Sequence, residues 1–390
     1  MIPGRPIRSG YTSPMLTGVQ ICYNSRLMTF YKTTGKFGEF GRVGEFKTRR
    51  GIVKTPTFMP DATRGAVKSL TPDQVYGAGV QVVLNNTYHL HLQPGEATIK
   101  SLGGVHGFGN WKGPILTDSG GYQVFSLSKL RKITEEGVTF KHPVTGEMRL
   151  ITPEKSIQIQ LNLGSDMIVA FDHLTGLDDE SIKDTLDAYE RTHRWLERCV
   201  TEFKKLTANV PEAERPLLFG VVQGGLDLDL RLKSLQTVQA SDVDGIAIGG
   251  LSVGETQAEM FKVLAHLAPH YDPNRPRFLL GVGTPADLHF AYEHGIDMAD
   301  CVLPTRNARH ATVWTTNDEK IHLTNERFTK DPEPIMPGCD CYACATGFSK
   351  AFLRHQFKVG EPLAGSLASI HNLRYLTRIC DEYIATAHQR

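Results

Sequence analysis

The stretch that decides the fold reads Leu217-Leu218-Phe219-Gly220-Val221-Val222 and runs directly into Gln223. A continuous apolar run of this length that ends in a polar residue is typical of a strand buried on both faces. Seven further short apolar or β-branched runs are followed within two residues by Gly or a polar residue, and they cover 57–59, 81–84, 114–117, 167–171, 245–248, 278–280 and 298–299. The chain therefore carries about eight candidate strands of a parallel sheet.

Helical patterns separate many of these runs. Apolar residues recur at a spacing near 3.6 over 181–206 and 256–267, and Thr71-Pro72-Asp73-Gln74 has the composition of a helix N-terminus. Strand and helix alternating about eight times predict a (β/α)8 TIM barrel, which is an α/β fold. A doubly wound open sheet is the structural alternative. It is disfavoured because no Gly-rich phosphate-binding turn follows the first strand.

Two segments interrupt or precede this alternation. Residues 126–151 contain two β-like stretches around Pro143-Val144-Thr145-Gly146, which predicts an inserted hairpin. Residues 34–54 predict a second hairpin, which we expect to seal the N-terminal end of the barrel. We expect three units: a disordered N-terminal extension at 1–27, a catalytic barrel at 28–304, and a zinc-binding subdomain with C-terminal helices at 305–390.

Composition narrows the class of protein. The 390 residues carry a net charge of +1 and are 40% hydrophobic, so any contact with nucleic acid must come from a local basic patch. The seven cysteines are odd in number and four of them are scattered, which disfavours a disulfide framework and favours a reducing compartment. No apolar run approaches the roughly 18 residues of a membrane span, and no secretory signal is evident, so we expect a cytoplasmic protein.

A cysteine cluster is the sharpest local motif. Cys339-Asp340-Cys341-Tyr342-Ala343-Cys344 places three thiols within six residues, and either His355 or His371 could supply a fourth ligand. Three Cys and one His suffice for closed tetrahedral coordination, which is how structural zinc is held. A closed site leaves no position for a reacting water, so we expect one structural Zn²⁺ and look for catalysis elsewhere.

Four polar residues fall at the carboxyl ends of predicted strands, where barrel enzymes carry their active sites: Asp118, Asp172, Gln223 and Asp300. Gathered carboxylates can bind a divalent metal, carry out glycoside chemistry, or accept hydrogen bonds from a guanine-like base. Gln223 and the backbone of Gly249-Gly250 could donate to O6 of such a base. A single strand-end Asp is more often a helix cap or a turn former, but the joint pattern favours a site.

Two other polar groups are less informative. His89 and His91 have no Cys or carboxylate close by in sequence, so a hydrogen-bonded structural role is the simpler interpretation. Arg306, Arg309 and His310 form a short basic run that would ordinarily be a solvated surface. Its position just after Asp300 would place it at the mouth of the pocket.

Several motifs together resemble the tRNA-guanine transglycosylases, also called queuine tRNA-ribosyltransferases, of the bacterial type. The resemblance runs from about residue 36 to 385. It rests on the motifs at 86–90 (NTYHL), 118–127 (DSGGYQVFSL), 222–225 (VQGG), 249–255 (GGLSVGE) and 300–306 (DCVLPTR), and on the three cysteines with His371.

The resemblance implies exchange of guanine at the wobble position, 34, of a tRNA with a GUN anticodon for a 7-deazaguanine. Asp300 matches the nucleophile that forms a covalent ribosyl intermediate, and Asp118 matches the general acid/base. The remaining implied roles are base binding by Asp172, Gln223, Gly250, Leu251, Tyr122 and Ser119, RNA contacts by Arg306 and Arg309, and zinc ligation by Cys339, Cys341, Cys344 and His371. A homodimer is implied by the family alone.

The chain departs from the family pattern at Phe171-Asp172-His173-Leu174, where an acidic residue and a Cys or Val usually follow the Asp. This departure leaves open whether queuine or one of its precursors is the incoming base. Two other functions compete with transglycosylation. One is a metal-dependent barrel hydrolase that uses Asp118, Asp172 and His89, and the other is a noncatalytic RNA-binding subunit.

Overall fold

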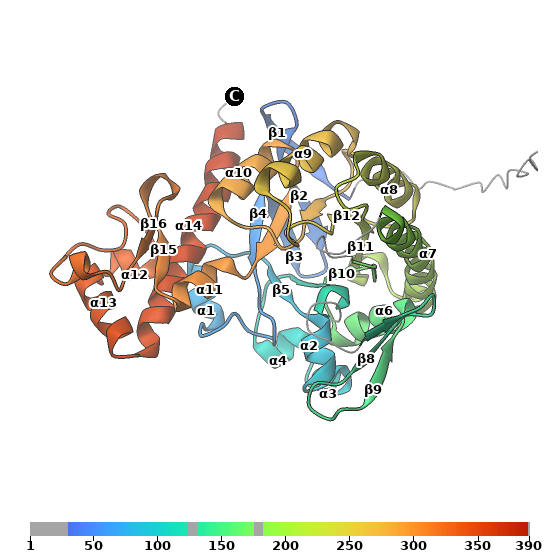
Figure 1. The fold of residues 1–390 in the computed structure, drawn as a ribbon, viewed down its shortest axis with the longest axis horizontal. Helices are drawn as coiled ribbons and strands as arrows, with labels where there is room; N and C mark the ends of the chain where they lie inside the picture. The colour runs from blue at the N-terminus through green and yellow to red at the C-terminus, as the bar shows by residue number, and fades with distance from the viewer. Residues whose placement is uncertain (1–29, 124–130, 175–181, 389–390) are drawn as a thin grey trace, which may run out of the picture.

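The protein folds around an eight-stranded parallel barrel (Figure 1). The structure, a computed structural model, describes residues 30–123, 131–174 and 182–388. The barrel strands are β4 (Thr57–Pro60), β5 (Val83–Asn85), β6 (Ile115–Thr117), β10 (Met167–Val169), β11 (Leu217–Val222), β12 (Gly245–Ile248), β13 (Arg277–Leu279) and β14 (Met298–Cys301). Each contains or overlaps one of the eight apolar runs, so the predicted fold class is confirmed.

Neighbouring strands in the barrel follow one another in the chain, and the last returns to the first. The order is β4-β14-β13-β12-β11-β10-β6-β5. β14 pairs in parallel with β4, and a parallel bridge between Asp61 and Leu84 brings β4 against β5. Ala62 N–H donates to the Leu84 carbonyl at 2.7 Å across this seam. The sheet is therefore nearly closed.

The predicted hairpin at 34–54 is part of a three-stranded antiparallel sheet of β1 (Lys32–Phe37), β2 (Gly41–Thr48) and β3 (Gly51–Thr55). Its Phe46 and Val53 belong to the same core cluster as Met167 and Leu217, the residues at which β10 and β11 begin. The antiparallel sheet therefore closes the N-terminal end of the barrel, and the interior is a packed core.

The second predicted insertion also forms an antiparallel sheet. It contains β7 (Arg131–Ile133), β8 (Val138–Lys141) and β9 (Met148–Ile151). The Phe140 ring lies 5.4 Å from the Tyr88 ring, measured between centroids, so the insertion packs against the barrel. Residues 126–130 of the predicted hairpin lie outside the described residues.

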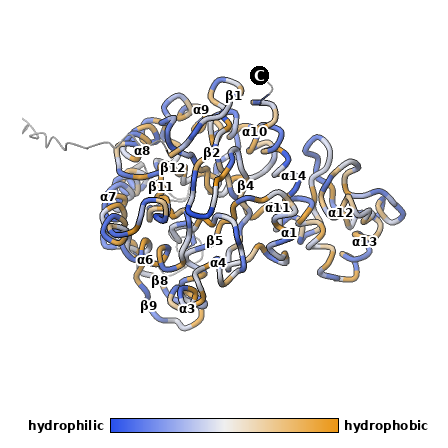
Figure 2. The backbone as a smooth tube through the Cα atoms, turned by 180° about the vertical axis from the view of Figure 1, so that it is seen from behind, coloured by the Kyte–Doolittle hydropathy of each residue, from blue (hydrophilic) through white to orange (hydrophobic). Residues whose placement is uncertain are grey.

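Helices surround the barrel (Figure 1). They are α1 (Pro72–Gly77), α2 (Thr87–Leu92), α3 (Glu96–Ser101), α4 (Gly104–Gly109), α6 (Pro153–Leu163), α7 (Ile182–Thr207), α8 (Leu228–Ala240), α9 (Gln257–Leu267) and α10 (Pro285–Glu293), with short 3-10 turns at Glu212–Glu214, Ala268–His270, Thr316–Asp318 and Glu326–Phe328. Thr71 and Thr256 begin α1 and α9 with capping boxes, which satisfy free backbone N–H groups. Hydrophobic and hydrophilic residues alternate along α7 (Figure 2), as expected for a helix with one buried face. None of the helices in the described ranges combines the length and apolar composition that a bilayer crossing requires.

The C-terminal region forms a lobe and one long helix. It contains α11 (Leu303–Arg309), β15 (Thr312–Trp314), β16 (Lys320–His322), α12 (Tyr342–Ala345), α13 (Lys350–Lys358) and α14 (Pro362–His388). Helix α14 lies between the lobe and the barrel (Figure 1). On the barrel side, Thr377 donates to the Ala78 carbonyl at 2.6 Å, and Cys380 Sγ lies 3.4 Å from the Tyr292 hydroxyl. The boundary at 304/305 stays a prediction, since α14 packs against both parts.

Candidate active site and metal centre

A layer of polar side chains lies directly above the packed interior of the barrel. Side chains alternate between the two faces of a strand, so the residue two places after an interior side chain also points inward. The interior core includes Met59, Leu84, Leu116, Val221 and Met298. Two residues further on stand Asp61, Asn86, Asp118, Gln223 and Asp300. We call these five residues, together with Asp172 just after β10, the polar ring.

Asp118 is fixed by the start of the neighbouring helix α2. Its Oδ1 accepts from the Thr87 backbone N–H at 2.8 Å, and its Oδ2 accepts from Asn86 Nδ2 at 2.5 Å. Burial raises the pKa of Asp118 to about 7, the Thr87 N–H opposes that shift, and the negative charge of Asp300 adds to it. A carboxyl group with this pKa can hold or release a proton near neutral pH.

Asp300 lies within β14 and is almost fully buried. Its Oδ1 accepts a hydrogen bond from the Gly281 N–H at 2.9 Å, just beyond the end of β13. Burial raises the pKa of Asp300 to about 7, although the Gly281 N–H favours the ionised form. The Gly281 bond holds one carboxylate oxygen and orients the other.

Asp61 was not predicted as a site residue. It follows β4, and its pKa is raised well above the ordinary range by burial and by the charges of Asp300 and Asp118. The alternation of Met59 and Asp61 along β4 was the available signal, because it repeats that of Met298 and Asp300 on β14.

The predicted base-binding residues Asp172, Gln223 and Ser119 are brought together. Asp172 Oδ2 accepts from Gln223 Nε2 at 2.7 Å, and its Oδ1 accepts from Ser119 Oγ at 3.1 Å. Burial raises the pKa of Asp172, while these two hydrogen bonds lower it. The network holds a carboxylate and an amide side by side at the ends of β10 and β11. These groups can pair with the polar edge of a base.

Asp172 and Gln223 form one wall of the polar ring, and Gly250 lies next in that wall. Gly250 is held there by Arg231 of α8, a second residue that the sequence did not point to. The guanidinium of Arg231 is fully buried and donates to the Gly249 carbonyl at 2.6 Å and the Gly250 carbonyl at 2.8 Å. It also donates to the Val222 carbonyl at 3.1 Å, next to Gln223. Gly250 has φ +63°, and a Cβ there would collide with Gln223 Oε1, so the position favours glycine.

Other predicted site residues lie on the rim or behind it. Tyr122 is 51% exposed and its ring is therefore accessible for stacking, whereas the Leu251 side chain is buried in a core cluster. Arg306 is exposed on α11, the helix that follows Asp300, and Arg309 of the same helix is half-buried. Burial and the neighbouring Arg306 lower the pKa of Arg309.

His173 and Leu174, which depart from the family pattern, are both buried behind Asp172. The His173 N–H donates to Thr192 Oγ1 at 3.0 Å, and Arg191 Nη1 lies 3.0 Å from His173 Nδ1. The position at which the resemblance predicts an acidic residue thus carries an imidazole that faces an arginine.

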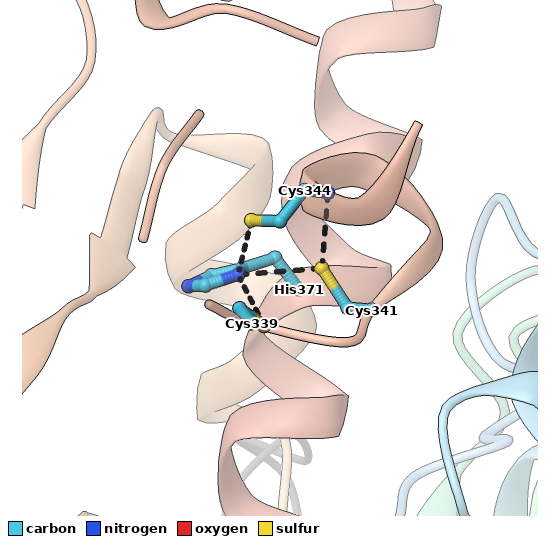
Figure 3. A group of neighbouring side chains, drawn as sticks. All are labelled: Cys339, Cys341, Cys344 and His371. Atoms are coloured by element: carbon cyan, nitrogen blue, oxygen red, sulfur yellow. Dashed lines mark hydrogen bonds between the residues drawn. The ribbon is translucent and has the colours of Figure 1, made fainter. Parts of the chain in front are cut away.

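Three cysteines and one histidine meet in the C-terminal lobe (Figure 3). The ligand atoms of Cys339, Cys341, Cys344 and His371 all lie within 4.8 Å of one another, and all four residues are buried. His355 is instead exposed on α13. Within 30–123, 131–174 and 182–388, this is the one group of three or more such residues with ligand atoms this close. Asp118, Asp172 and His89 do not form one, which counts against the metal-dependent hydrolase.

The distances fit a tetrahedral metal. His371 Nδ1 lies 3.7, 3.5 and 3.4 Å from the sulfurs of Cys339, Cys341 and Cys344. A tetrahedral zinc with Zn–S of about 2.3 Å and Zn–N of about 2.1 Å would separate sulfur and nitrogen by about 3.6 Å. His371 Nε2 donates to the Trp314 carbonyl at 2.8 Å, which leaves Nδ1 free to ligate. The cluster can hold a metal ion.

The fold and the polar ring are those expected of a barrel enzyme, a class in which the active site lies at the carboxyl ends of the strands. A family model described as queuine tRNA-ribosyltransferase matches residues 38–384. The chain belongs to this family. The expectation of a tRNA-guanine transglycosylase, which is a pentosyltransferase, is confirmed at the level of the family.

Named relatives agree with this assignment. A queuine tRNA-ribosyltransferase of Nostoc sp. is 48% identical over 337 residues, which is 86% of this chain and 87% of the relative. The enzyme of that name from Hamiltonella defensa is 45% identical over 348 residues, or 89% of this chain and 90% of the relative. One from Symbiobacterium thermophilum is 46% identical over 343 residues, covering 87% of this chain and 83% of the relative.

Proposed function

We propose that this enzyme exchanges guanine at the wobble position of a GUN anticodon for a 7-deazaguanine, through a covalent ribosyl-Asp300 intermediate. The observation that carries this proposal is the placement of Asp300 and Asp118 in one buried ring, close enough for their charges to interact. Two carboxyl groups with pKa values of about 7 can exist as one acid and one carboxylate near neutrality.

The first displacement breaks the bond between ribose C1′ and guanine N9. The free oxygen of Asp300 attacks C1′, the bonding electrons leave with guanine, and Asp118 supplies the proton that neutralises the departing base. The products are a ribosyl ester of Asp300, neutral guanine and ionised Asp118. The Gly281 N–H, which binds the other Asp300 oxygen, fixes the direction of attack.

The second displacement reverses these roles. The incoming base gives its N9 proton to Asp118, attacks C1′ and releases Asp300 as a carboxylate. One glycosidic bond replaces another, so the reaction needs no nucleotide cofactor. The guanine must leave its stack in the anticodon loop to reach the ring.

Base recognition is proposed for the wall opposite Asp300. Asp172 would accept from the N–H groups of the base, while Gln223 and the Gly250 and Leu251 backbone would complete the hydrogen-bonding edge. Ser119 orients Asp172. The exposed Tyr122 ring would stack on the base.

The remaining proposed features lie outside the ring. Arg306 and Arg309 would contact the anticodon loop, since α11 starts where β14 ends. The bound metal would be one structural Zn²⁺ held by the three cysteines and His371, and it would brace the lobe without taking part in catalysis. A homodimer in the cytoplasm fits the family.

A trapping experiment tests the covalent route. The enzyme is mixed with an unmodified GUN-anticodon tRNA and a base analogue that leaves poorly, and the mixture is run on a denaturing gel. We expect a slow band in the wild type and none in Asp300→Asn. Absence of the band in the wild type, or its persistence in the variant, would contradict the proposal. Asp242→Asn, an exposed residue before β12 at the opposite end of the barrel, is the control.

A second assay identifies the incoming base. Exchange is measured with the aminomethyl precursor, the cyano precursor and queuine, each against radiolabelled guanine already in the tRNA. Release of label with any of them supports the function, and the ranking names the base. A noncatalytic RNA-binding subunit would bind the tRNA and release no label.

A further inference from the structure

One carboxylate of the polar ring has no assigned role. Asp61 Oδ2 is inaccessible to solvent, and no group in the described part of the chain forms a hydrogen bond with it. Buried polar atoms are nearly always hydrogen-bonded, so an unpaired one at an active site requires an explanation. The neighbouring carboxylates Asp118, Asp172 and Asp300 all accept hydrogen bonds from protein groups.

The strand register places Asp61 next to the proposed nucleophile. In the pairing of β14 with β4, Asp300 is opposite Met59 and Cys301 is opposite Pro60. Asp61 follows directly, on a strand about 4.8 Å from that of Asp300. Its other neighbour is β5, through the bridge to Leu84. Asp61 therefore lies between Asp300 and the Asn86–Asp118 pair.

This position is on the sugar side of the pocket. The base-binding groups Asp172, Gln223 and Gly250 come from the ends of β10, β11 and β12, whereas β4 lies on the far side of β14 and β13 from β12. A nucleotide whose base occupies that wall must present C1′ to Asp300 for attack. Its ribose then extends over β14 and β4, where Asp61 stands.

The 2′-hydroxyl is attached to the carbon next to C1′, so it is the ribose group nearest to the attacked atom. We propose that the carboxyl group of Asp61, a residue that is partly exposed, turns to accept a hydrogen bond from the 2′-hydroxyl of the nucleotide being exchanged, and that Asp61 thereby makes the enzyme select an RNA sugar. This inference rests on the proposed function. It adds a specificity residue to the same site.

Two observations favour a hydroxyl over a cation as the partner of Asp61. Its ligand atoms do not form a three-residue metal group with other described His, Cys, Asp or Glu residues. Its pKa is raised well above the ordinary range, so the neutral carboxyl group is favoured. A neutral carboxyl group binds a hydroxyl better than it binds a cation. The 2′-hydroxyl is also the group that distinguishes RNA from DNA at a single nucleotide.

The test compares two anticodon stem-loops that differ by one oxygen atom. One carries guanosine and the other 2′-deoxyguanosine at the exchanged position, and kcat/KM for labelled guanine exchange is measured for wild type, Asp61→Ala and Asp61→Asn. We expect the wild type to favour the ribose substrate by about 10- to 100-fold, the range of one hydrogen bond to a buried polar group. Asp61→Ala should lose that factor on the ribose substrate and give a ratio near 1.

Asp61→Asn keeps an acceptor oxygen and should retain part of the preference, which guards against a variant that merely folds poorly. Asp242→Ala should match the wild type in rate and ratio. A wild-type ratio retained in Asp61→Ala, or a wild type that treats both substrates alike, would overturn the inference. A wild type that exchanges neither substrate would overturn the proposed function itself.

Discussion

The polar ring and the metal centre both gather reactive side chains, but they are assembled in opposite ways. The metal centre takes three ligands from one six-residue segment that runs into α12, and the fourth from α14. The ring takes single residues from successive strand ends between Asp61 and Asp300, and only closure of the barrel brings them together. Local spacing therefore reveals the first site, whereas topology builds the second.

The two sites also differ in how well their polar groups are satisfied. In the metal centre, a hydrogen bond to Trp314 fixes His371 and the sulfurs face a common point. In the ring, burial raises the pKa of Asp118, Asp172 and Asp300, so these groups resist ionisation. A site whose buried carboxyl groups are costly to ionise is expected to be catalytic. A site whose polar groups all have partners is expected to be structural.

The largest effect is expected at Asp300. Asp300→Asn removes the attacking carboxylate and keeps the acceptor for the Gly281 N–H, so the fold should survive. We expect guanine exchange to fall by at least ~10³-fold, because loss of a covalent nucleophile removes the reaction path. Exchange of radiolabelled guanine into tRNA is the measurement, with Asp242→Asn as control. Activity near the wild-type level would place the chemistry outside the ring.

Loss of the metal should affect folding and RNA binding more than chemistry. Chelation, or Cys344→Ser, should unfold the lobe, because structural zinc binding in small domains supplies ~10 kcal/mol or more of folding free energy. We expect a lower melting temperature and a higher KM for tRNA, with kcat changed by less than about threefold. Cys199→Ser, which alters a buried cysteine of α7, should keep one zinc per chain. An unchanged melting temperature in the metal-free protein would mean that the metal does not stabilise the lobe.

Arg231 tests whether the base-binding wall is positioned from behind. Arg231→Met removes the donors to the Gly249 and Gly250 carbonyls. We expect KM for the incoming base to rise by about 10- to 100-fold, equivalent to one or two lost hydrogen bonds to a charged group. Arg231→Lys should recover part of it, and Lys233→Met on the exposed face of α8 is the matched control. A fall in stability with an unchanged KM would make Arg231 structural only.

The pH profile tests the division of protons in the ring. Asp300 must be ionised to attack, so activity should rise as pH increases through about 7, and Asp118 must be protonated to serve as the acid, so activity should fall above about 7. We expect a narrow bell for kcat/KM, with roughly tenfold loss one to two pH units from its centre. A flat profile between pH 5.5 and 8.5 would contradict these roles.

The last expected effect is a gain in stability in place of a loss of activity. The pKa of Asp300 is raised from its ordinary value, near 3.9 in an unfolded chain, to about 7 in the native state. The native state therefore binds this proton more tightly, and the stability that it contributes is present below about pH 4 and lost as pH rises through about 7. Asp300→Asn should exceed the wild type by about 4 kcal/mol in urea unfolding at pH 8 and match it near pH 4. A less stable variant at pH 8 would mean that the ring does not destabilise the fold.

Much of the architecture was predictable because it rests on periodic patterns. All eight apolar runs are barrel strands, and both predicted hairpins are antiparallel sheets in the described ranges. Spacing alone left His355 and His371 open as ligands, and the path of α14 brings His371 to the cysteines. The division into domains stays a prediction.

The site was only partly predictable. Asp118, Asp172, Gln223 and Asp300 were singled out because each follows an apolar run, and their catalytic and binding roles stay predictions. Asp61 follows such a run too, but Pro60 intervenes, and counting residues by twos from Met59 would have found it. Arg231 had no local signal. Its partners are carbonyl groups at the end of β11 and just after β12, and only the folded chain brings them to Arg231.

The sheet of β1, β2 and β3 under the barrel affects how the small bases can enter and leave the enzyme. Phe46 and Val53 pack into the lower end of the barrel, so we expect the polar ring to be reached from the carboxyl ends of the strands, where the tRNA would bind on the proposed route. On the proposed route the tRNA is still tethered when the old base departs and its replacement arrives. The departing guanine and the incoming base must then both pass beside the ribose. Turnover would depend on how far the anticodon loop can move while the tRNA stays bound.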